Sequence, residues 1–261
     1  MKKILLALFV MCSALSFSAK VIKATDIDVK GNVVYEAGQN TPYTGFIETY
    51  NEKNVLLARS EFKNGIQDGS SKIYFPNGKL YSEATFQNGK QVGVQKDYYE
   101  NGKVKIETTY KNGQKTGPAK IYDENGRLDT EANLVNGKAE GLVKSYYPNG
   151  KIRTEENYKN DERDGIAKAY DENGKLVQQA TFKNGVQVGL QKDYYEDGKL
   201  KMELNYKNGK AEGIGRSYYP NGKVFIEENY KNGERDGVAK AYDENGKLLQ
   251  QATFKNGQQI K

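Results

Sequence analysis

The sequence has little of the residues on which most active-site chemistry depends. It contains no histidine, no tryptophan and one cysteine, Cys12, among 261 residues. Disulfide pairing and imidazole or thiolate catalysis therefore have little basis in this chain. Only 36% of the residues are hydrophobic and the mean hydropathy is -0.85, too polar for a large closed core. With 28 glycines and 20 tyrosines, the composition indicates many turns and amphipathic aromatic side chains rather than disorder.

Long hydrophobic runs are also missing, except for one at the N-terminus. A Met-Lys-Lys start precedes an apolar run over residues 4–17, which is typical of a secretory signal peptide and too short for a membrane span. We predict cleavage near Ser18 or Ala19. Cys12 raises the alternative of a lipoprotein anchor, but Met11 before it is bulkier than lipoprotein processing prefers. We therefore expect an exported protein of the periplasm or cell surface.

Charge of one sign is not in large excess either. The net charge of +6 falls to +4 once Lys2 and Lys3 are lost with the signal peptide. This weak balance permits anionic partners without requiring them. Nucleic acid is not expected as a partner of an exported chain.

What the sequence does contain is a repeat. Glycine recurs at a constant interval of 24 residues, at Gly45, Gly69, Gly93, Gly117, Gly141, Gly165, Gly189, Gly213 and Gly237. Tyrosine keeps the same interval from Tyr50 to Tyr242. A fixed period of this length predicts a repeat architecture in which each unit packs against its neighbours.

Asn-Gly pairs mark two turns in each unit. We name turn A after Asn77-Gly78 and its equivalents, and turn B after Asn64-Gly65 and its equivalents. The segments between the turns are short, alternate in polarity and carry Tyr, Phe, Ile and Val, as strands do. Each unit is therefore predicted to be two antiparallel strands. The fold class is all-β: an elongated, twisted single-layer antiparallel sheet of successive β-hairpins.

The residue before Asn favours a three-residue loop at turn A. Pro76 suits the second position of a type I turn and Gly78 the left-handed position that follows, whereas a two-residue loop is the alternative. The three-residue loop sets Tyr74 opposite Leu80, so even-numbered positions would face even-numbered ones and gather Tyr74 with Phe86 on one apolar face.

Charged residues repeat at the same interval. A lysine or arginine lies two residues before each repeating tyrosine, and these pairs form the predicted binding surface: Lys72, Tyr74, Lys96, Tyr98, Lys120, Tyr122, Lys144, Tyr146, Lys168, Tyr170, Lys192, Tyr194, Arg216, Tyr218, Lys240 and Tyr242. The alternative is that lysine stems simply cover the rings while their amines reach water. The other strand of each unit carries Glu83, Glu107, Glu131, Glu155, Glu203 and Glu227, with Gln179 and Gln251 at two further positions. We expect these glutamates on the opposite face.

The predicted organisation has three parts. A signal peptide covers residues 1–19, an N-terminal capping hairpin with its lead-in covers residues 20–44, and nine tandem 24-residue hairpin repeats cover residues 45–261. Because sheets twist, we expect a curved trough whose concave side holds the Tyr and Phe side chains. Open strand edges favour pairing with another chain, so end-to-end self-association is expected to be available.

Two patterns resemble catalytic or metal motifs. The repeated glutamates suggest the carboxylate pair of a glycosidase, but identical positions offer no distinct surroundings to set two pKa values apart. The Asp-Glu-Asn-Gly segment at residues 123–126 resembles a calcium loop without its further spaced ligands. We assign no catalytic, cofactor or metal site and expect no enzyme activity.

At the level of whole units the sequence resembles a known family. The segments YYPNGKIRTEENYKNDERDG, YKNGERDG and GKLVQQATFKNG are similar to the bacterial variant of the MORN repeat, found in proteins often labelled YwqK-family antitoxins. The resemblance covers residues 41–257, although the tryptophan of the eukaryotic MORN unit is absent and Asp161 replaces one turn glycine, which would loosen that turn. It implies an elongated array of hairpins that serves as a scaffold or binding module.

We therefore predict an exported, non-catalytic scaffold that binds a protein or an anionic envelope polymer through its long concave Tyr- and Lys-lined surface. The antitoxin label implies one alternative, a periplasmic toxin-neutralising protein. The other alternative is a module that contacts membrane lipid or glycan.

Overall fold

The computed structural model describes residues 19–260, so the predicted signal peptide lies almost entirely outside the described residues. The regular structure in this range is all β-strand. The N-terminal strands are β1 (Val21–Lys23), β2 (Ile27–Lys30), β3 (Val33–Glu36), β4 (Gly45–Tyr50), β5 (Leu56–Lys63), β6 (Ile66–Tyr74), β7 (Leu80–Gln87), β8 (Lys90–Tyr98), β9 (Val104–Lys111), β10 (Gln114–Tyr122), β11 (Leu128–Val135) and β12 (Lys138–Ala139). The remaining strands are β13 (Gly141–Tyr146), β14 (Ile152–Lys159), β15 (Glu162–Tyr170), β16 (Leu176–Lys183), β17 (Val186–Tyr194), β18 (Leu200–Lys207), β19 (Lys210–Ala211), β20 (Gly213–Tyr218), β21 (Val224–Lys231), β22 (Glu234–Arg235), β23 (Gly237–Tyr242), β24 (Leu248–Lys255) and β25 (Gln258–Gln259).

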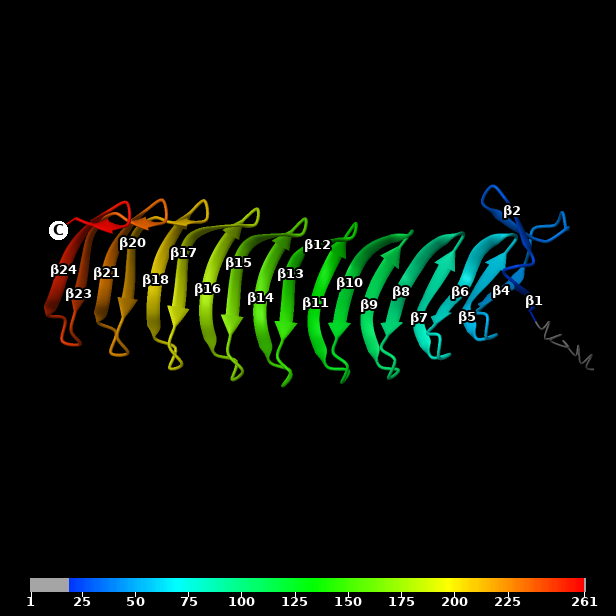
Figure 1. Cartoon of the computed structure of the whole chain (residues 1–261), viewed down its shortest axis with the longest axis horizontal. Coiled ribbons are helices and arrows are strands. Elements are labelled where there is room, and N and C mark those ends of the chain that lie inside the picture. The colour runs from blue at the N-terminus through cyan, green and yellow to red at the C-terminus, as the bar shows by residue number, and fades with distance from the viewer. Residues whose placement is uncertain (1–18, 261) are drawn as a thin grey trace, which may run out of the picture.

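The strands lie side by side in chain order, which makes the molecule a long row of hairpins (Figure 1). One 23-stranded sheet contains every strand from β4 onward in antiparallel pairing, and β1 joins it in parallel alongside β4. β2 and β3 form a separate hairpin at the N-terminal end. The prediction of an all-β, single-layer array of successive hairpins is confirmed.

Turn A is the predicted three-residue loop. The amide of Phe75 donates to the carbonyl of Lys79 and the amide of Gly78 donates to the carbonyl of Phe75, both at 2.8 Å. Gly78 has a φ of 81°, which glycine adopts without steric cost. Proline before Asn therefore occupies the second position of a type I turn, and Tyr74 pairs with Leu80 as expected.

A β-bulge beside turn A overturns the predicted alternation. The pair that follows Tyr74 and Leu80 is Ile73 with Ser82, so Tyr81 is an extra residue in its strand. The same shift recurs in every repeat from β4 to β24. One extra residue reverses which side chains share a face. The prediction that even-numbered positions face even-numbered ones was therefore wrong beyond the bulge.

Turn B is a two-residue turn in which both residues have positive φ. The values are 51° at Asn64 and 75° at Gly65, as in the type I′ turns whose twist matches that of the flanking strands. Asp161, which takes the glycine position in one unit, keeps a φ of 71°. Its carboxylate accepts a hydrogen bond from the amide of Ala139 in the preceding hairpin. The substitution therefore leaves the turn in the same conformation.

Hydrogen bonds between successive turns join each hairpin to the next. On the turn B side, the amide of Gly89 donates to the carbonyl of Gln67 at 2.8 Å, and equivalent bonds recur along the array as far as Gly257 and Arg235. On the turn A side, hydroxyl groups donate to carbonyls 23 residues further along the chain, from Tyr99, Tyr147, Tyr195 and Tyr219. Each unit is thus held mainly by its two neighbours.

Few side chains are fully buried, because a single layer has no second layer to cover it. The core cluster of Ile22, Tyr43 and Ile47 lies at the N-terminal end. The Tyr43 hydroxyl donates to the carbonyls of Lys20 and Phe46 at 2.9 Å each, which fixes the chain at the start of β4. Within residues 19–260, no helix is long and apolar enough to cross a membrane.

Candidate binding surface

The repeating cations and carboxylates form one row on one face of the sheet. Lys96 pairs with Glu83 in the strand before it and with Glu107 in the strand after it. Equivalent pairings continue across the sheet in the order Glu48, Arg59, Lys72, Glu83, Lys96, Glu107, Lys120, Glu131, Lys144, Glu155, Lys168, Gln179, Lys192, Glu203, Arg216, Glu227, Lys240 and Gln251. We name this row the ladder and its side of the sheet the ladder face. The prediction that the glutamates project from the face opposite the lysines was wrong, because the bulge shifts the pairing by one residue.

Ladder cations form ion pairs with the carboxylates beside them. Arg216 lies 2.8 Å from the Glu227 carboxylate and 3.8 Å from that of Glu203. The ammonium group of Lys96 lies 3.6 Å from Glu107. These pairs are partly exposed, so each adds little to stability. Their main effect is that the ladder presents alternating charge rather than a cationic groove.

Tyr50 donates its hydroxyl to the ladder glutamate Glu48, and five further repeating tyrosines donate theirs to the ladder glutamate 15 residues earlier in the chain. In these five, donor and acceptor lie at 2.6 Å for Tyr98 and Glu83, 2.9 Å for Tyr122 and Glu107, 2.6 Å for Tyr146 and Glu131, 2.7 Å for Tyr170 and Glu155, and 2.6 Å for Tyr218 and Glu203. Burial first, and then this hydrogen bond to a carboxylate, raises the pKa of each of the five to about 12. The structure thus brings tyrosine and glutamate together, although sequence reasoning had separated them.

This arrangement changes what the predicted surface offers. Each cation of the predicted surface, from Lys72 to Lys240, pairs in the ladder with a carboxylate or with one of the two glutamines, Gln179 and Gln251. The hydroxyl groups of the tyrosines that bind glutamate are already engaged within the ladder. Binding by these residues stays a prediction.

Sequence reasoning missed a row of exposed aliphatic side chains beside the ladder. Their exposed fractions lie between 40% and 47%, and the row consists of Val94, Leu142, Ile166, Leu190 and Ile214. Each lies two residues before a ladder cation in the same strand and therefore on the ladder face. We name it the aliphatic row. The signal that would have located the row is an aliphatic residue that directly follows the repeating glycine and so recurs at the 24-residue period.

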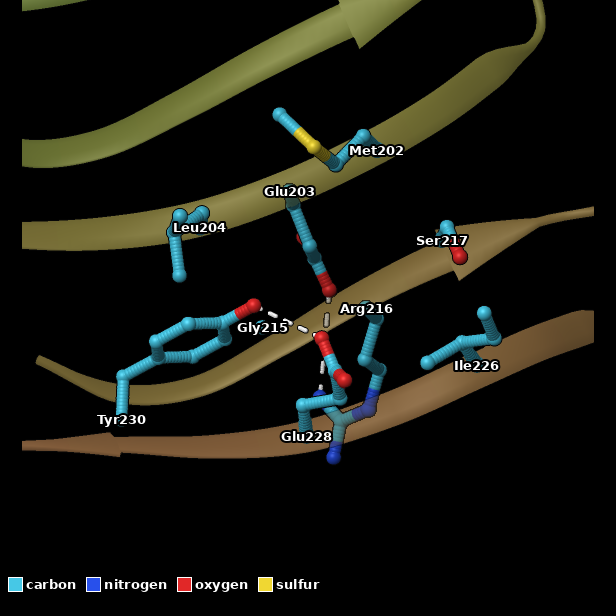
Figure 2. A pocket seen from close by; sticks show the side chains of 9 residues that line it. All are labelled: Met202, Glu203, Leu204, Gly215, Arg216, Ser217, Ile226, Glu228 and Tyr230. Carbon is cyan, nitrogen blue, oxygen red and sulfur yellow. Dashed lines mark hydrogen bonds and ion pairs between the residues drawn. The ribbon is translucent and has the colours of Figure 1, made fainter. Parts of the chain in front are cut away.

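The opposite face is hollowed and carries many small side chains. Figure 2 shows one such hollow over β18, β20 and β21, lined by Met202, Leu204, Gly215, Ser217, Ile226, Glu228 and Tyr230, among others. A Cβ atom at Gly215 would lie 2.8 Å from Leu204 Cδ1 and 3.2 Å from Tyr230 Cε2, so a larger residue there would force the Leu204 side chain to shift. The Tyr230 hydroxyl donates to Glu228 at 2.7 Å. The ladder residues Glu203 and Arg216 complete the lining.

Fold and surface together define a class of protein, a linear array of β-hairpins whose surface repeats with the period of its sequence. The model of the MORN repeat variant family matches eight consecutive segments, at residues 67–88, 91–112, 115–136, 139–160, 163–184, 187–208, 211–232 and 235–256. The chain belongs to this family. The narrower likeness to YwqK-family antitoxins stays a prediction.

The solved structures that match this chain include several of low TM-score. An S. aureus TarM mutant in complex with fondaparinux, α-GlcNAc-glycerol and UDP is 14% identical with a TM-score of 0.27, over 37% of this chain and 19% of that one. The aligned region thus spans about a fifth of the TarM chains that match, 19% of one and 20% of another. A porin-like protein from Bacteroides uniformis is 10% identical with a TM-score of 0.19, over 85% of this chain and 89% of that one. A search of curated proteins returns no match.

Proposed function

We propose that the protein is a non-catalytic binding scaffold whose ladder face takes up one long partner along the array. Repetition is the observation that carries this proposal, because cation, carboxylate, tyrosine and aliphatic positions recur every 24 residues on the same face. Such a face offers many similar weak contacts rather than one deep site. Contacts of this kind add up when a partner engages several of them at once.

The chemistry of the face suits a partner with both apolar and charged groups. The aliphatic row supplies apolar contact area, and the ladder beside it supplies charges of both signs. A strip of apolar contact bordered by polar groups is the usual anatomy of a protein interface. We take the partner to be a protein or an anionic envelope polymer, met outside the cytoplasm if the N-terminal sequence acts as a signal peptide.

Deleting whole units tests the proposal. The partner is first captured from envelope fractions with the chain from residue 19 onward, and its affinity is then measured for chains that lack residues 141–164, 165–188 or both. Each single deletion removes one period, so Glu140 or Asp164 at the junction is again followed by a glycine and the pairing continues. Affinity should fall stepwise, with similar losses for either single deletion. Loss of all binding on deleting one of the two units would instead indicate one local site and contradict the proposal.

Point variants separate the two faces. Ile166→Ser and Leu190→Ser together should weaken binding, since both residues belong to the aliphatic row. Ile73→Ser is the matched control, because Ile73 is 46% exposed but pairs with Ser82 on the opposite face. Equal effects from the two changes would count against the ladder face as the binding surface.

A further inference from the structure

The ladder is interrupted once between two lysines. Lys168 pairs with Gln179, and Gln179 pairs with Lys192, so an uncharged amide stands where the regular ladder has a carboxylate. In the regular pattern Glu131 occupies this place between Lys120 and Lys144. Two cations therefore border a position that carries no negative charge.

The spacing of the strands lets the ammonium groups of Lys168 and Lys192 reach the same point above Gln179. β15 and β17 flank β16, so Lys168 and Lys192 lie two strand spacings apart, about 10 Å. Each ammonium group has a flexible four-carbon stem and three rotatable donors. The two lysines and Gln179 are all half-buried on the same face, and the amide group of Gln179 adds two donors between them.

The hydroxyl of Tyr194 is available at the same place. In five other units the equivalent tyrosine donates to the glutamate 15 residues earlier, as Tyr170 does to Glu155. Fifteen residues before Tyr194 stands Gln179, and within residues 19–260 the Tyr194 hydroxyl makes no hydrogen bond to a side chain or carbonyl. A phenol donor thus stands beside the position that lacks a negative charge.

Other irregular positions of the ladder do not combine these features. Arg59 replaces a carboxylate near the N-terminal end, but it lies 3.1 Å from Glu48 and stacks 4.1 Å from the centre of the Phe46 ring. Gln251 borders one lysine of the described residues, Lys240. The position of Gln179 is therefore distinct within the array.

We propose that Lys168, Gln179, Lys192 and Tyr194 form a binding site for a phosphate group. A phosphate offers several acceptor oxygens to the two ammonium groups, the amide and the phenol, and a charged acceptor makes each of these hydrogen bonds stronger. Ile166 and Leu190 of the aliphatic row stand two residues before the two lysines and are 44% and 40% exposed. The phosphate therefore sits beside apolar surface, which admits either inorganic phosphate or the phosphate of a lipid headgroup. The site does not depend on the partner proposed above.

Titration with inorganic phosphate at constant ionic strength, followed by amide NMR, tests this site. Signals of residues around Gln179 should shift and saturate in the chain from residue 19 onward. Gln179→Glu restores the regular ladder and should fold normally, because six other units carry glutamate there. It should weaken phosphate binding at least about tenfold, because the new carboxylate would engage the lysine and tyrosine donors and would repel the phosphate. Unchanged binding in Gln179→Glu would overturn the proposal.

Two further variants separate the site from net charge. Gln251→Glu changes the net charge by the same amount at another place and should leave phosphate binding unchanged. If it weakened phosphate binding as much as Gln179→Glu does, net charge would explain the effect and the proposal would be overturned. Glu131→Gln should create a second site between Lys120 and Lys144, because it also frees the Tyr146 hydroxyl. Failure of that variant to gain a phosphate-dependent shift would contradict the assigned set of donors.

Vesicles distinguish the two sources of phosphate. The same chain is mixed with phosphatidylglycerol vesicles and with phosphatidylcholine vesicles, with Gln179→Glu as the control. If the intact chain binds vesicles and Gln179→Glu does not, the site takes a lipid headgroup. If the chain binds inorganic phosphate but no vesicles, the site takes a free phosphate. Absence of both kinds of binding would overturn the proposal.

Discussion

Tyr146 shows what a single side chain contributes to the array. Its hydroxyl donates to Glu131 at 2.6 Å across neighbouring hairpins. Tyr146→Phe removes this donor and should lower the free energy of unfolding by about 1.5 kcal/mol, the lower end of the range for a hydrogen bond to a charged group, because the pair is partly exposed. Tyr194→Phe is the matched control, because Gln179 replaces the glutamate acceptor there. Urea denaturation measures both variants, and equal losses would show that the bond to glutamate adds no stability.

The same hydrogen bonds make stability depend on alkaline pH. The pKa of the five ladder tyrosines rises from 10.0 to about 12 in the folded chain, chiefly by burial and then by the bond to glutamate. A raised pKa means that the folded state holds the proton more tightly than the unfolded state. Their contribution is therefore complete below pH 10 and is lost as pH rises from 10 to 12.

The free energy of unfolding should accordingly fall over this pH range. The tyrosine share of this fall is the difference between the free energies of unfolding of the intact chain and of a variant with Phe at Tyr98 and Tyr146. That variant should show a shallower fall. Identical pH profiles for the two proteins would contradict the assignment.

At the scale of the strand, the sequence predicts pairing close to the turns and fails one residue further on. Pro76 and Gly78 carry the chemistry of their loop, so the pairing of Tyr74 with Leu80 follows from residue type. The bulge residue has no such signature, since the equivalents of Tyr81 include Lys105, Asp129, Val177 and Leu249. Backbone geometry rather than residue type sets that bulge. The fold was therefore predictable, whereas the faces of the two charge series were not.

Facing side chains on neighbouring strands also compensate for each other in size. Leu204 packs over Gly215, and three units earlier the same two positions hold Ala132 and Val143. Gly215→Val should cost about 1–3 kcal/mol by overpacking against Leu204. Adding Leu204→Ala should recover most of this loss, because the pair then equals the one in the earlier unit. A double-mutant cycle measures the coupling, and simply additive costs would contradict this packing.

Over the whole molecule, stability comes from contacts between neighbours rather than from one core. The cluster of Ile22, Tyr43 and Ile47 covers only the N-terminal end, and each later hairpin is held by the hairpins on either side. In such an array the stability of a unit depends on how many neighbours it has. The duplicated units are therefore chemically alike but differ in stability with their position.

Native-state hydrogen exchange should reveal this gradient. Amide protection should be highest in central strands such as β14 and lowest in β24, with β4 above β24 because β1 and the core cluster cover it. Tyr43→Ala removes a side chain that is 4% exposed and should lower protection in β4 towards that of β24 while leaving β14 unchanged. Mass spectrometry of peptides from each strand measures this. Equal protection in all strands, falling together in Tyr43→Ala, would show that the array unfolds as one cooperative unit instead.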